Sequence, residues 1–433
     1  MRAWIGVMVA CVAALAATGA WAAETGYRLS VVTERPEAFY RVGETARFVV
    51  TLEQGGAPAA AGEVAYILDK DGVPPVTQGR AKVENGRAVI EGRLGEPGFL
   101  RCRVTFKPEE GDGLSAVAGA GFDPEQIGPS MPAPNDFDAF WSRQKARLAA
   151  VPFEPKLTPV SSPQEGVECF DVQIPCVPPR PVSGYFARPV GAAPKSLPAI
   201  LTVHGAGVRS SSLGGAVSQA RSYRALAMDI NAHGIPNGQP ESFYAALNAG
   251  ELKDYRSLGR ESAEECYFLG MFLRLVRALE FLTRQPEWDG KVLMVLGSSQ
   301  GGGQAIAAAG LDPRVTFISA GVPALCDHTG SVVGRISGWP KLVPVVDGKP
   351  DEKILQVSRY FDCVNFARRA RAEAIFSVGL IDSTCPPTSV YAAYNAYAGK
   401  KRIIVEPLMG HAVSPRLSQS TSEAMRAHIA ATR

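Results

Sequence analysis

The chain has no marked excess of charge of either sign. Its 433 residues carry 45 Lys and Arg against 42 Asp and Glu, for a formal net charge of +3. A balance this close to neutral does not favour nucleic acid or an anionic membrane surface as a partner, because both attract concentrated positive charge. Low-complexity segments and internal repeats are also missing, which argues against disordered and solenoid proteins.

Long apolar runs are missing beyond the first residues, so no membrane-spanning helix is expected. At the N-terminus, Arg2 precedes an apolar run at residues 3–17, and Ala20-Trp21-Ala22 fits the small-x-small rule for cleavage. We therefore expect a signal peptide at residues 1–22 and a periplasmic or secreted protein. Lipidation at Cys11 is less favoured, because only a very short apolar run precedes that residue.

Closely spaced cysteine pairs are absent. Of the eight cysteines, Cys11 lies in the predicted signal peptide, and the other seven cannot all pair within a monomer. None of them shows the C-x-x-C spacing of a structural zinc site. We expect neither a disulfide framework nor a metal, and no cofactor is indicated. The cysteines are interpreted mainly as small buried apolar side chains.

The sequence pattern changes near residue 122. Residues 23–122 contain short β-prone runs separated by turn residues, which predicts an immunoglobulin-like β-sandwich. Residues 123–135 are rich in Pro and Gly and are predicted to be a linker. The runs expected to be strands are 27–32, 46–52, 64–68, 88–92 and 99–106.

The second predicted domain, residues 136–433, opens with an amphipathic helix and then alternates apolar runs with helical patterns. Because the apolar runs are continuous, the strands are expected to be buried on both faces of a largely parallel sheet. The alternation predicts a doubly wound α/β fold. Residues 235–259 break the rhythm, and such folds carry a cap or an oligomer contact there. The expected strands are 199–203, 225–228, 292–296, 315–319, 374–378 and 403–405.

A G-x-S-x-G motif lies between an expected strand and a run of small residues, and its sequence is Gly297-Ser298-Ser299-Gln300-Gly301. This order places Ser299 on a sharp turn against a helix N-terminus, with its hydroxyl exposed. The structural alternative is a simple glycine-rich turn, since Gly and Ser are common. The motif therefore makes Ser299 a candidate nucleophile that needs partners.

A serine nucleophile requires a base, and in an α/β-hydrolase the base follows the serine and the acid in the chain. Of the five histidines, His411 fits best, because it lies in the loop after the strand at 403–405. His328 comes too soon after Ser299 for an acid to intervene on its own strand. His428 belongs to a C-terminal helical pattern.

The remaining parts of a serine-hydrolase site also follow expected strands. Asp382 lies directly after the strand at 374–378 and is the candidate acid, although a turn aspartate would look the same. The oxyanion needs two donors. Gln300 N–H, directly after the nucleophile, and Ala206 N–H, in the loop after the strand at 199–203, are the candidates.

These segments together resemble carbohydrate esterase family seven, the acetyl xylan esterase and cephalosporin-C deacetylase group of α/β-hydrolases. The resemblance is spread over most of residues 136–412. It implies an α/β-hydrolase fold and a serine esterase that acts on acetylated carbohydrate. The motifs that carry it are Phe137-Asp138-Ala139-Phe140-Trp141, His204-Gly205, residues 297–303, Val322-Pro323-Ala324-Leu325-Cys326-Asp327, Asp382 with Cys385-Pro386-Pro387, Ala392-Ala393-Tyr394-Asn395 and Gly410-His411.

The resemblance places the family's functional residues on positions of this chain, which departs from the family's pattern at three places. Ala206 stands where the family usually has tyrosine, Asn231-Ala232-His233 replaces Arg-Gly-Gln, and Ala412 replaces a glutamate. Because the oxyanion donor is a backbone N–H, the first change need not abolish the hole. Family members commonly form hexamers, so a homo-oligomer is an open expectation. The implied triad is Ser299, Asp382 and His411, with Gln300 and Ala206 as oxyanion donors.

The function predicted from the sequence is an exported serine esterase that deacetylates poly- or oligosaccharides through an acetyl-serine intermediate. An exported α/β-hydrolase for other acyl or uronate esters, or for peptides, is the enzymatic alternative, because the triad does not choose the leaving group. A glycan-binding protein with a degenerate hydrolase domain is the alternative from another class. Trp339 and Tyr391 could stack on a sugar ring or be packing aromatics.

Overall fold

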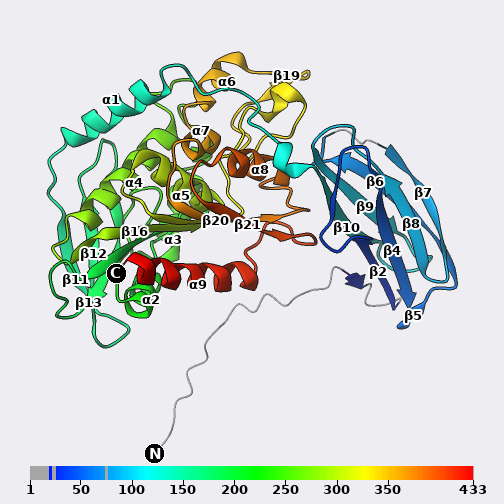
Figure 1. The fold of residues 1–433 in the computed structure, drawn as a ribbon, viewed down its shortest axis with the longest axis horizontal. Helices are drawn as coiled ribbons and strands as arrows, with labels where there is room; N and C mark the ends of the chain where they lie inside the picture. Colours follow the sequence, from blue (N-terminus) through cyan, green and yellow to red (C-terminus); the bar gives the residue numbers. More distant parts are fainter. Residues whose placement is uncertain (1–18, 22–25, 74–76, 433) are drawn as a thin grey trace, which may run out of the picture.

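The computed structural model describes residues 19–21, 26–73 and 77–432, which form two domains (Figure 1). The predicted signal peptide lies outside the described residues, except for β1 (Gly19–Trp21), which pairs with β2 (Tyr27–Thr33). No described helix combines the length and apolar character needed to cross a bilayer. All seven described cysteines are unpaired and buried, which confirms their interpretation as packing residues.

The N-terminal domain is a β-sandwich, as predicted. Its hydrogen-bonded strand order is β2-β4-β8-β7-β6-β9-β10, and β7 and β8 pair only at their hairpin turn, where the order divides into two layers. Side chains from both layers, among them Phe48 and Val104, enclose one apolar core. The further strands are β3 (Phe39–Tyr40), β4 (Ala46–Gln54), β5 (Ala57–Pro58), β6 (Ala61–Lys70), β7 (Thr77–Glu84), β8 (Arg87–Gly92), β9 (Gly98–Phe106) and β10 (Leu114–Phe122).

The second domain contains a nine-stranded sheet in the order β11-β12-β13-β15-β14-β16-β17-β20-β21. From β15 to β21 neighbouring strands run parallel, whereas β11, β12 and β13 are antiparallel. The predicted doubly wound α/β fold is therefore confirmed. The strands are β11 (Lys156–Val160), β12 (Val167–Ile174), β13 (Val182–Pro189), β14 (Leu197–Val203), β15 (Leu226–Ile230), β16 (Trp288–Ser298), β17 (Phe317–Gly321), β20 (Glu373–Gly379) and β21 (Lys401–Glu406).

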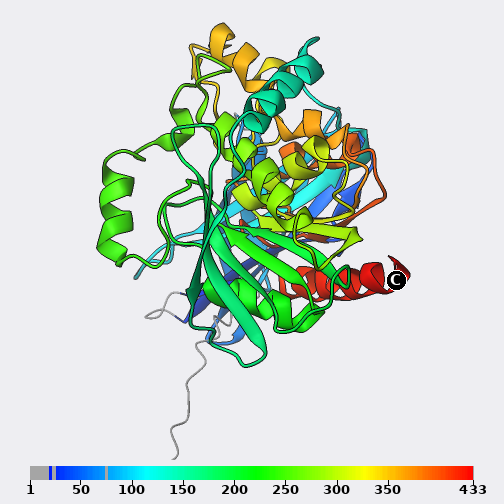
Figure 2. The same ribbon diagram turned by 90° about the vertical axis from the view of Figure 1, so that its left-hand side faces the viewer.

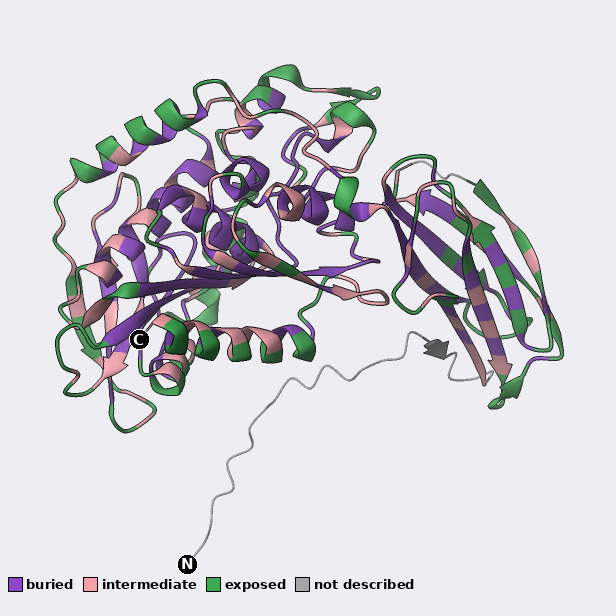
Figure 3. Ribbon diagram, in the orientation of Figure 1, coloured by how far each residue is buried: buried purple, intermediate pink, exposed green. Residues whose placement is uncertain are grey.

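Helices cover both faces of this sheet (Figures 1 and 2). The central strands of the sheet are buried (Figure 3). Successive side chains point to opposite faces, so Leu201 and Val295 join one core while Ile200 and Met294 join another. The Ile200 core also contains residues of α9 (Pro415–Thr432). The other helices are α1 (Phe137–Ala149), α2 (Leu213–Tyr223), α4 (Tyr267–Thr283), α5 (Gln300–Leu311), α6 (Glu352–Ser358), α7 (Cys363–Ala367) and α8 (Pro387–Ala396).

Residues 235–259, expected to be a cap or an oligomer contact, contain α3 (Glu241–Ala249) and the 3-10 turn η2 (Tyr255–Ser257). Figure 2 shows α3 standing away from the body of the domain. The segment then returns to the core, because Tyr255 is only 5% exposed. It therefore joins an exposed projection to the interior of the catalytic domain.

Residues 123–135, predicted to be a linker, pack along the second domain. The side chain of Asn395 donates to the carbonyls of Pro124 at 2.9 Å and Ile127 at 2.8 Å. The backbone N–H and hydroxyl of Ser130 donate to the carboxylate of Asp327 at 2.9 and 2.7 Å. The connection between the domains is therefore fixed by buried and half-buried polar contacts.

Candidate active site

Ser299 lies on a sharp turn between β16 and α5. Its backbone angles, φ 57° and ψ −125°, fall outside the regions that L residues usually adopt, and such strain costs on the order of 1–3 kcal/mol. Backbone hydrogen bonds hold the turn: the Ser299 N–H donates to Gly321 at 2.8 Å, and its carbonyl accepts from Ala324 at 2.9 Å and Gly303 at 3.1 Å. This is the strained strand-to-helix turn that the G-x-S-x-G motif predicts.

The glycines after Ser299 allow α5 to approach the strand ends. A Cβ at Gly301 would lie 2.3 Å from the carbonyl oxygen of Val203, and one at Gly303 would lie 2.4 Å from that of Ala324. Neither position has room for a side chain. The N-terminus of α5 therefore lies directly at the carboxyl edge of the sheet, where its free N–H groups face the site of the nucleophile.

Ser299, His411 and Asp382 form one hydrogen-bonded chain. His411 Nε2 lies 2.9 Å from Ser299 Oγ, and His411 Nδ1 lies 2.8 Å from Asp382 Oδ2. A carboxylate only accepts, so Nδ1 carries the proton and Nε2 accepts the serine hydroxyl. The Asp382 side chain is 0% exposed and the His411 side chain 27% exposed. The candidate acid is therefore shielded from water, whereas the candidate base is accessible from solvent.

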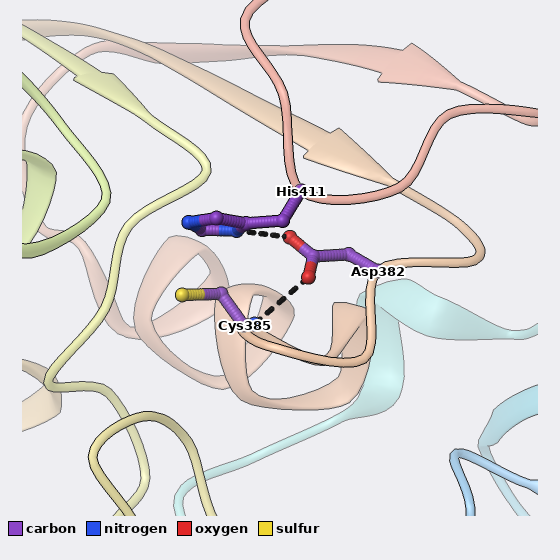
Figure 4. Close-up of side chains that lie close together, drawn as sticks. All are labelled: Asp382, Cys385 and His411. Carbon is purple, nitrogen blue, oxygen red and sulfur yellow. Dashed lines mark hydrogen bonds and ion pairs between the residues drawn. The ribbon is translucent and has the colours of Figure 1, made fainter.

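The other carboxylate oxygen of Asp382, Oδ1, accepts the backbone N–H groups of Thr384 at 2.8 Å and Cys385 at 2.9 Å. Figure 4 shows Asp382 between its contact with Cys385 and His411. Both oxygens have partners, so the carboxylate is held in one orientation. This geometry lets Asp382 select the tautomer of His411.

Cys385 completes a group of three side chains with Asp382 and His411 (Figure 4). Their ligand atoms lie within 4.8 Å of one another, and no other such group occurs among the residues that the structure describes. Both ring nitrogens of His411 are already engaged, so an ion here would have to displace the bond to Asp382 or to Ser299. The arrangement suits a proton relay better than a metal centre.

Both predicted oxyanion donors lie beside Ser299. Gln300 is the first residue of α5, so its N–H has no carbonyl partner within the helix. A Cβ at Gly205 would lie 3.5 Å from the Ser299 Cβ, which places the loop of residues 204–207 against the nucleophile. In the described part of the chain, the Ala206 N–H in this loop donates to no backbone carbonyl. Both N–H groups are thus free for a ligand.

His204 orients the peptide plane that carries the Ala206 N–H. Its Nδ1 donates to the Gly205 carbonyl at 2.6 Å, and its Nε2 accepts from the Ala232 N–H at 3.3 Å. In a trans peptide the C=O and the following N–H point in opposite directions, so fixing the Gly205 carbonyl also fixes the Ala206 N–H. Burial, with Arg209 nearby, lowers the pKa of His204 to about 4 and keeps the ring neutral.

His233 holds the other end of the same loop. Its Nε2 donates to the Gly207 carbonyl at 3.1 Å, and its Nδ1 accepts from the Tyr267 hydroxyl at 2.5 Å. Burial lowers the pKa of His233 to about 3. The ring lies edge-on to Tyr255 with 4.6 Å between centroids, and the Tyr255 hydroxyl donates to the side-chain oxygen of Gln300 at 2.7 Å. These residues form what is called here the oxyanion network. It contacts both the loop that carries the Ala206 N–H and the side chain of Gln300, the two predicted oxyanion donors.

Sequence reasoning did not assign His233, Tyr255 or Tyr267 to the site. A signal existed for His233, which follows β15 at the carboxyl edge of the sheet where the loops of such folds converge. Nothing in the sequence links Tyr255 to Gln300, which lies 45 residues further along the chain. Only the return of the segment after α3 to the core brings them together.

The two aromatic residues predicted to contact sugar differ in surroundings. Trp339 is half-buried, and its role stays a prediction. Tyr391 is 2% exposed, and its ring packs against Phe99 of the sandwich at 5.3 Å and Tyr394 at 5.9 Å between centroids. The ring is therefore largely enclosed where the two domains meet. The packing favours the alternative role of Tyr391 as a packing aromatic at the contact between the domains, and its sugar contact stays a prediction.

Residues 125–426 match the family model described as acetyl xylan esterase (AXE1). The chain belongs to the acetyl xylan esterase family. The resemblance seen in the sequence motifs is thereby confirmed, and as a member of this family the protein is a carboxylic ester hydrolase. The family match begins at residue 125, after the sandwich, so the sandwich is an addition to the part that the acetyl xylan esterase model describes.

The comparisons with individual proteins are consistent with the family assignment. An acetyl esterase of Xylanibacter ruminicola, Axe7A, is 31% identical over 398 residues, which cover 89% of this chain and 87% of that protein. The solved acetyl xylan esterase of Paenibacillus sp. R4 has a TM-score of 0.60 and 28% identity, over 70% of this chain and 98% of its own. Acetyl xylan esterase 1 of Thermoanaerobacterium sp. JW/SL YS485 shares the fold, with a TM-score of 0.57 and 24% identity over 70% and 97% of the two chains.

Proposed function

We propose that this acetyl xylan esterase family member is an exported serine esterase that removes acetyl groups from acetylated poly- or oligosaccharides. The observation that carries the proposal is the hydrogen-bonded chain from Ser299 through His411 to Asp382, with 2.9 and 2.8 Å between the partners. Two similar proteins are named for deacetylation, the acetyl esterase of Xylanibacter ruminicola and the acetyl xylan esterase of Paenibacillus sp. R4. These names support the substrate class.

In the first half of the reaction, Ser299 Oγ attacks the carbonyl carbon of the acetyl ester while His411 Nε2 takes the serine proton. The N–H groups of Gln300 and Ala206 donate to the oxyanion of the tetrahedral intermediate. The bond to the sugar oxygen then breaks, and His411 returns the proton to that oxygen. The products are a free sugar hydroxyl and acetyl-Ser299.

In the second half, a water molecule takes the place of the sugar alcohol. His411 removes a proton from the water as it attacks acetyl-Ser299, and the same two N–H groups receive the oxyanion. The bond to Ser299 Oγ breaks, the proton returns to the serine, and acetate leaves. Asp382 stays ionised throughout and stabilises the imidazolium that forms twice in each cycle.

Export is supported by the apolar segment at residues 3–17 and the cleavage motif that ends at Ala22. A mature chain that begins at Ala23 would fit this proposal. N-terminal sequencing of protein recovered from outside the cytoplasm checks the cleavage point. Recovery of the full-length chain from the cytoplasm alone would contradict export.

The proposal is tested with Ser299→Ala and a panel of esters. Removing the nucleophile should lower kcat for p-nitrophenyl acetate by about 10⁴-fold or more. The native protein should release acetate from acetylated xylan, mannan or pectin. Retained hydrolysis in the variant would overturn Ser299 as nucleophile. Preferred cleavage of longer acyl esters, uronate esters or peptides would overturn the substrate class, and glycan binding without hydrolysis would show a non-catalytic protein.

A further inference from the structure

One strand of the sandwich lies directly against the loop that carries Asp382. Alternate residues of β10, Ala116, Ala118 and Ala120, belong to the sandwich core. The residues between them point outward, and a Cβ at Gly119 would lie 2.5 Å from the carbonyl oxygen of Leu380 and 2.9 Å from its Cβ. Gly119 is buried although it faces away from its own core. The backbone of β10 therefore touches the segment two residues before Asp382.

The loop that carries His411 also contacts the sandwich. Leu408, three residues before His411, packs against the core cluster of the sandwich although it belongs to the catalytic domain. Figure 1 shows the loops after β20 and β21 reaching toward this domain. The loops that carry Asp382 and His411 thus both contact the sandwich domain.

Backbone contacts join the two loops, called here the acid loop (residues 380–385) and the base loop (residues 407–412). The Leu380 N–H donates at 3.1 Å to the carbonyl of Glu406, which directly precedes the base loop, and the Ile381 N–H donates to that of Met409 at 3.3 Å. A Cβ at Gly379 would lie 2.2 Å from the Met409 carbonyl oxygen. Since the loops are in such close contact, a displacement of one is transmitted to the other.

We propose that the sandwich is a structural part of the active site, in which the outward face of β10 sets the positions of the acid loop and the base loop. Gly119 and Leu408 are then positioning residues. The inference rests on the proposed roles of Asp382 and His411, and it assigns a role to a domain that lies before the family match. The alternative is a passive spacer, whose surface would have no effect on kcat.

The first test is Gly119→Ala in the full chain. The added methyl group must displace Leu380 or β10, and an error of order 1 Å in a catalytic group costs up to about 100-fold, so kcat for p-nitrophenyl acetate should fall about 10- to 100-fold. KM should change little, because this small ester does not contact the sandwich. A passive spacer predicts an unchanged kcat.

Gly92→Ala is the control, because it places an added methyl group at similarly short distances from side chains inside the sandwich and away from the acid loop. A Cβ at Gly92 would lie 2.6 Å from a methyl carbon of Leu100 and 2.8 Å from one of Leu68, both in the sandwich. This variant should lower the Tm without lowering kcat of the folded protein. Equal losses of kcat in the two variants would overturn the proposal, since general destabilisation would then explain both.

A second pair of variants serves if Gly119→Ala does not fold. Leu408→Ala should lower kcat with little change in KM, and Leu408→Met should restore it because the volumes of Leu and Met are similar. Native kcat in Leu408→Ala would overturn the contribution of the base loop contact. Ser299→Ala separates the two proposals: an inactive Ser299→Ala together with native Gly119→Ala and Leu408→Ala refutes only the positioning role.

Discussion

The two sides of the candidate active site are supported in different ways. The oxyanion side, with Ala206 and Gln300, is held by the buried polar network of His204, His233 and Tyr255 within the catalytic domain. The side of Asp382 and His411 rests on a second domain through close backbone and apolar contacts. A polar network fails when one partner is lost, because a buried group is then left unsatisfied. When an apolar side chain is shortened, the loss of stability instead grows with the volume of the cavity that it leaves.

The largest effect is expected on the acid and base side, from Asp382→Asn. The N–H groups of Thr384 and Cys385 require an acceptor, so the carbonyl oxygen of Asn would face them and its NH₂ would face His411. Nδ1 would then have to accept, the proton would move to Nε2, and His411 could not deprotonate Ser299. We expect kcat to fall about 10⁴-fold with the fold intact.

Steady-state kinetics with p-nitrophenyl acetate measures the loss in Asp382→Asn, and a circular dichroism spectrum like that of the native protein is the control for folding. A kcat within tenfold of the native value would mean that Asp382 does not select the tautomer. The acid and base side of the candidate site would then not depend on the orientation of Asp382.

The next effect is expected on the oxyanion side, from two substitutions of His233. A Gln side chain can place its NH₂ where Nε2 donates to Gly207, whereas an Asn side chain can place its oxygen only where Nδ1 accepts from Tyr267. If the bond to Gly207 holds the loop, His233→Asn should lower kcat by about 100-fold, the loss typical of one oxyanion donor. His233→Gln should keep most of the activity.

The kinetic comparison of these two variants distinguishes positioning from packing, since both replacements are polar and uncharged. Similar kcat values for Asn and Gln would show that the hydrogen bond to Gly207 is not what matters. KM should be nearly the same in both, because neither side chain contacts the ester.

The smallest effect is expected on the pH dependence of the free energy of unfolding. Burial lowers the pKa values of His204 and His233 in the folded protein to about 4 and about 3, below the value near 6.5 expected in the unfolded chain. The unfolded state therefore binds more protons, and stability that is complete above pH 6.5 is lost as the pH falls toward 4. Each histidine contributes a slope of about 1.4 kcal/mol in the free energy of unfolding per pH unit.

Urea unfolding at several pH values between 7 and 4.5 checks this slope. His233→Gln should make it shallower, because glutamine does not titrate, while His204 still contributes. An unchanged slope in the variant would show that folding does not lower the pKa of His233. The oxyanion network would then differ from the neutral arrangement described above.

The sequence predicted the features of the fold and of the candidate site that local sequence patterns encode. Continuous apolar runs revealed the parallel strands, and the order of Ser299, Asp382 and His411 after three of them revealed the candidate triad. Strand β10 was not predicted, because its run of Ala and Gly carries little β signal. Polar β7 and the antiparallel strands β11 to β13 were missed too, since none of them is a continuous apolar run.

By itself, therefore, the sequence determined the fold class, the family and the strained turn at Ser299, because each is carried by motifs or runs whose own residues lie close together in the chain. Only the tertiary structure decided that Tyr391 packs on Phe99, that Tyr255 reaches Gln300, and that β10 lies against the acid loop. Each of these contacts joins segments far apart in sequence. Which segments meet is decided by the close packing of the whole folded chain, within and between the domains. A local sequence pattern does not encode that packing.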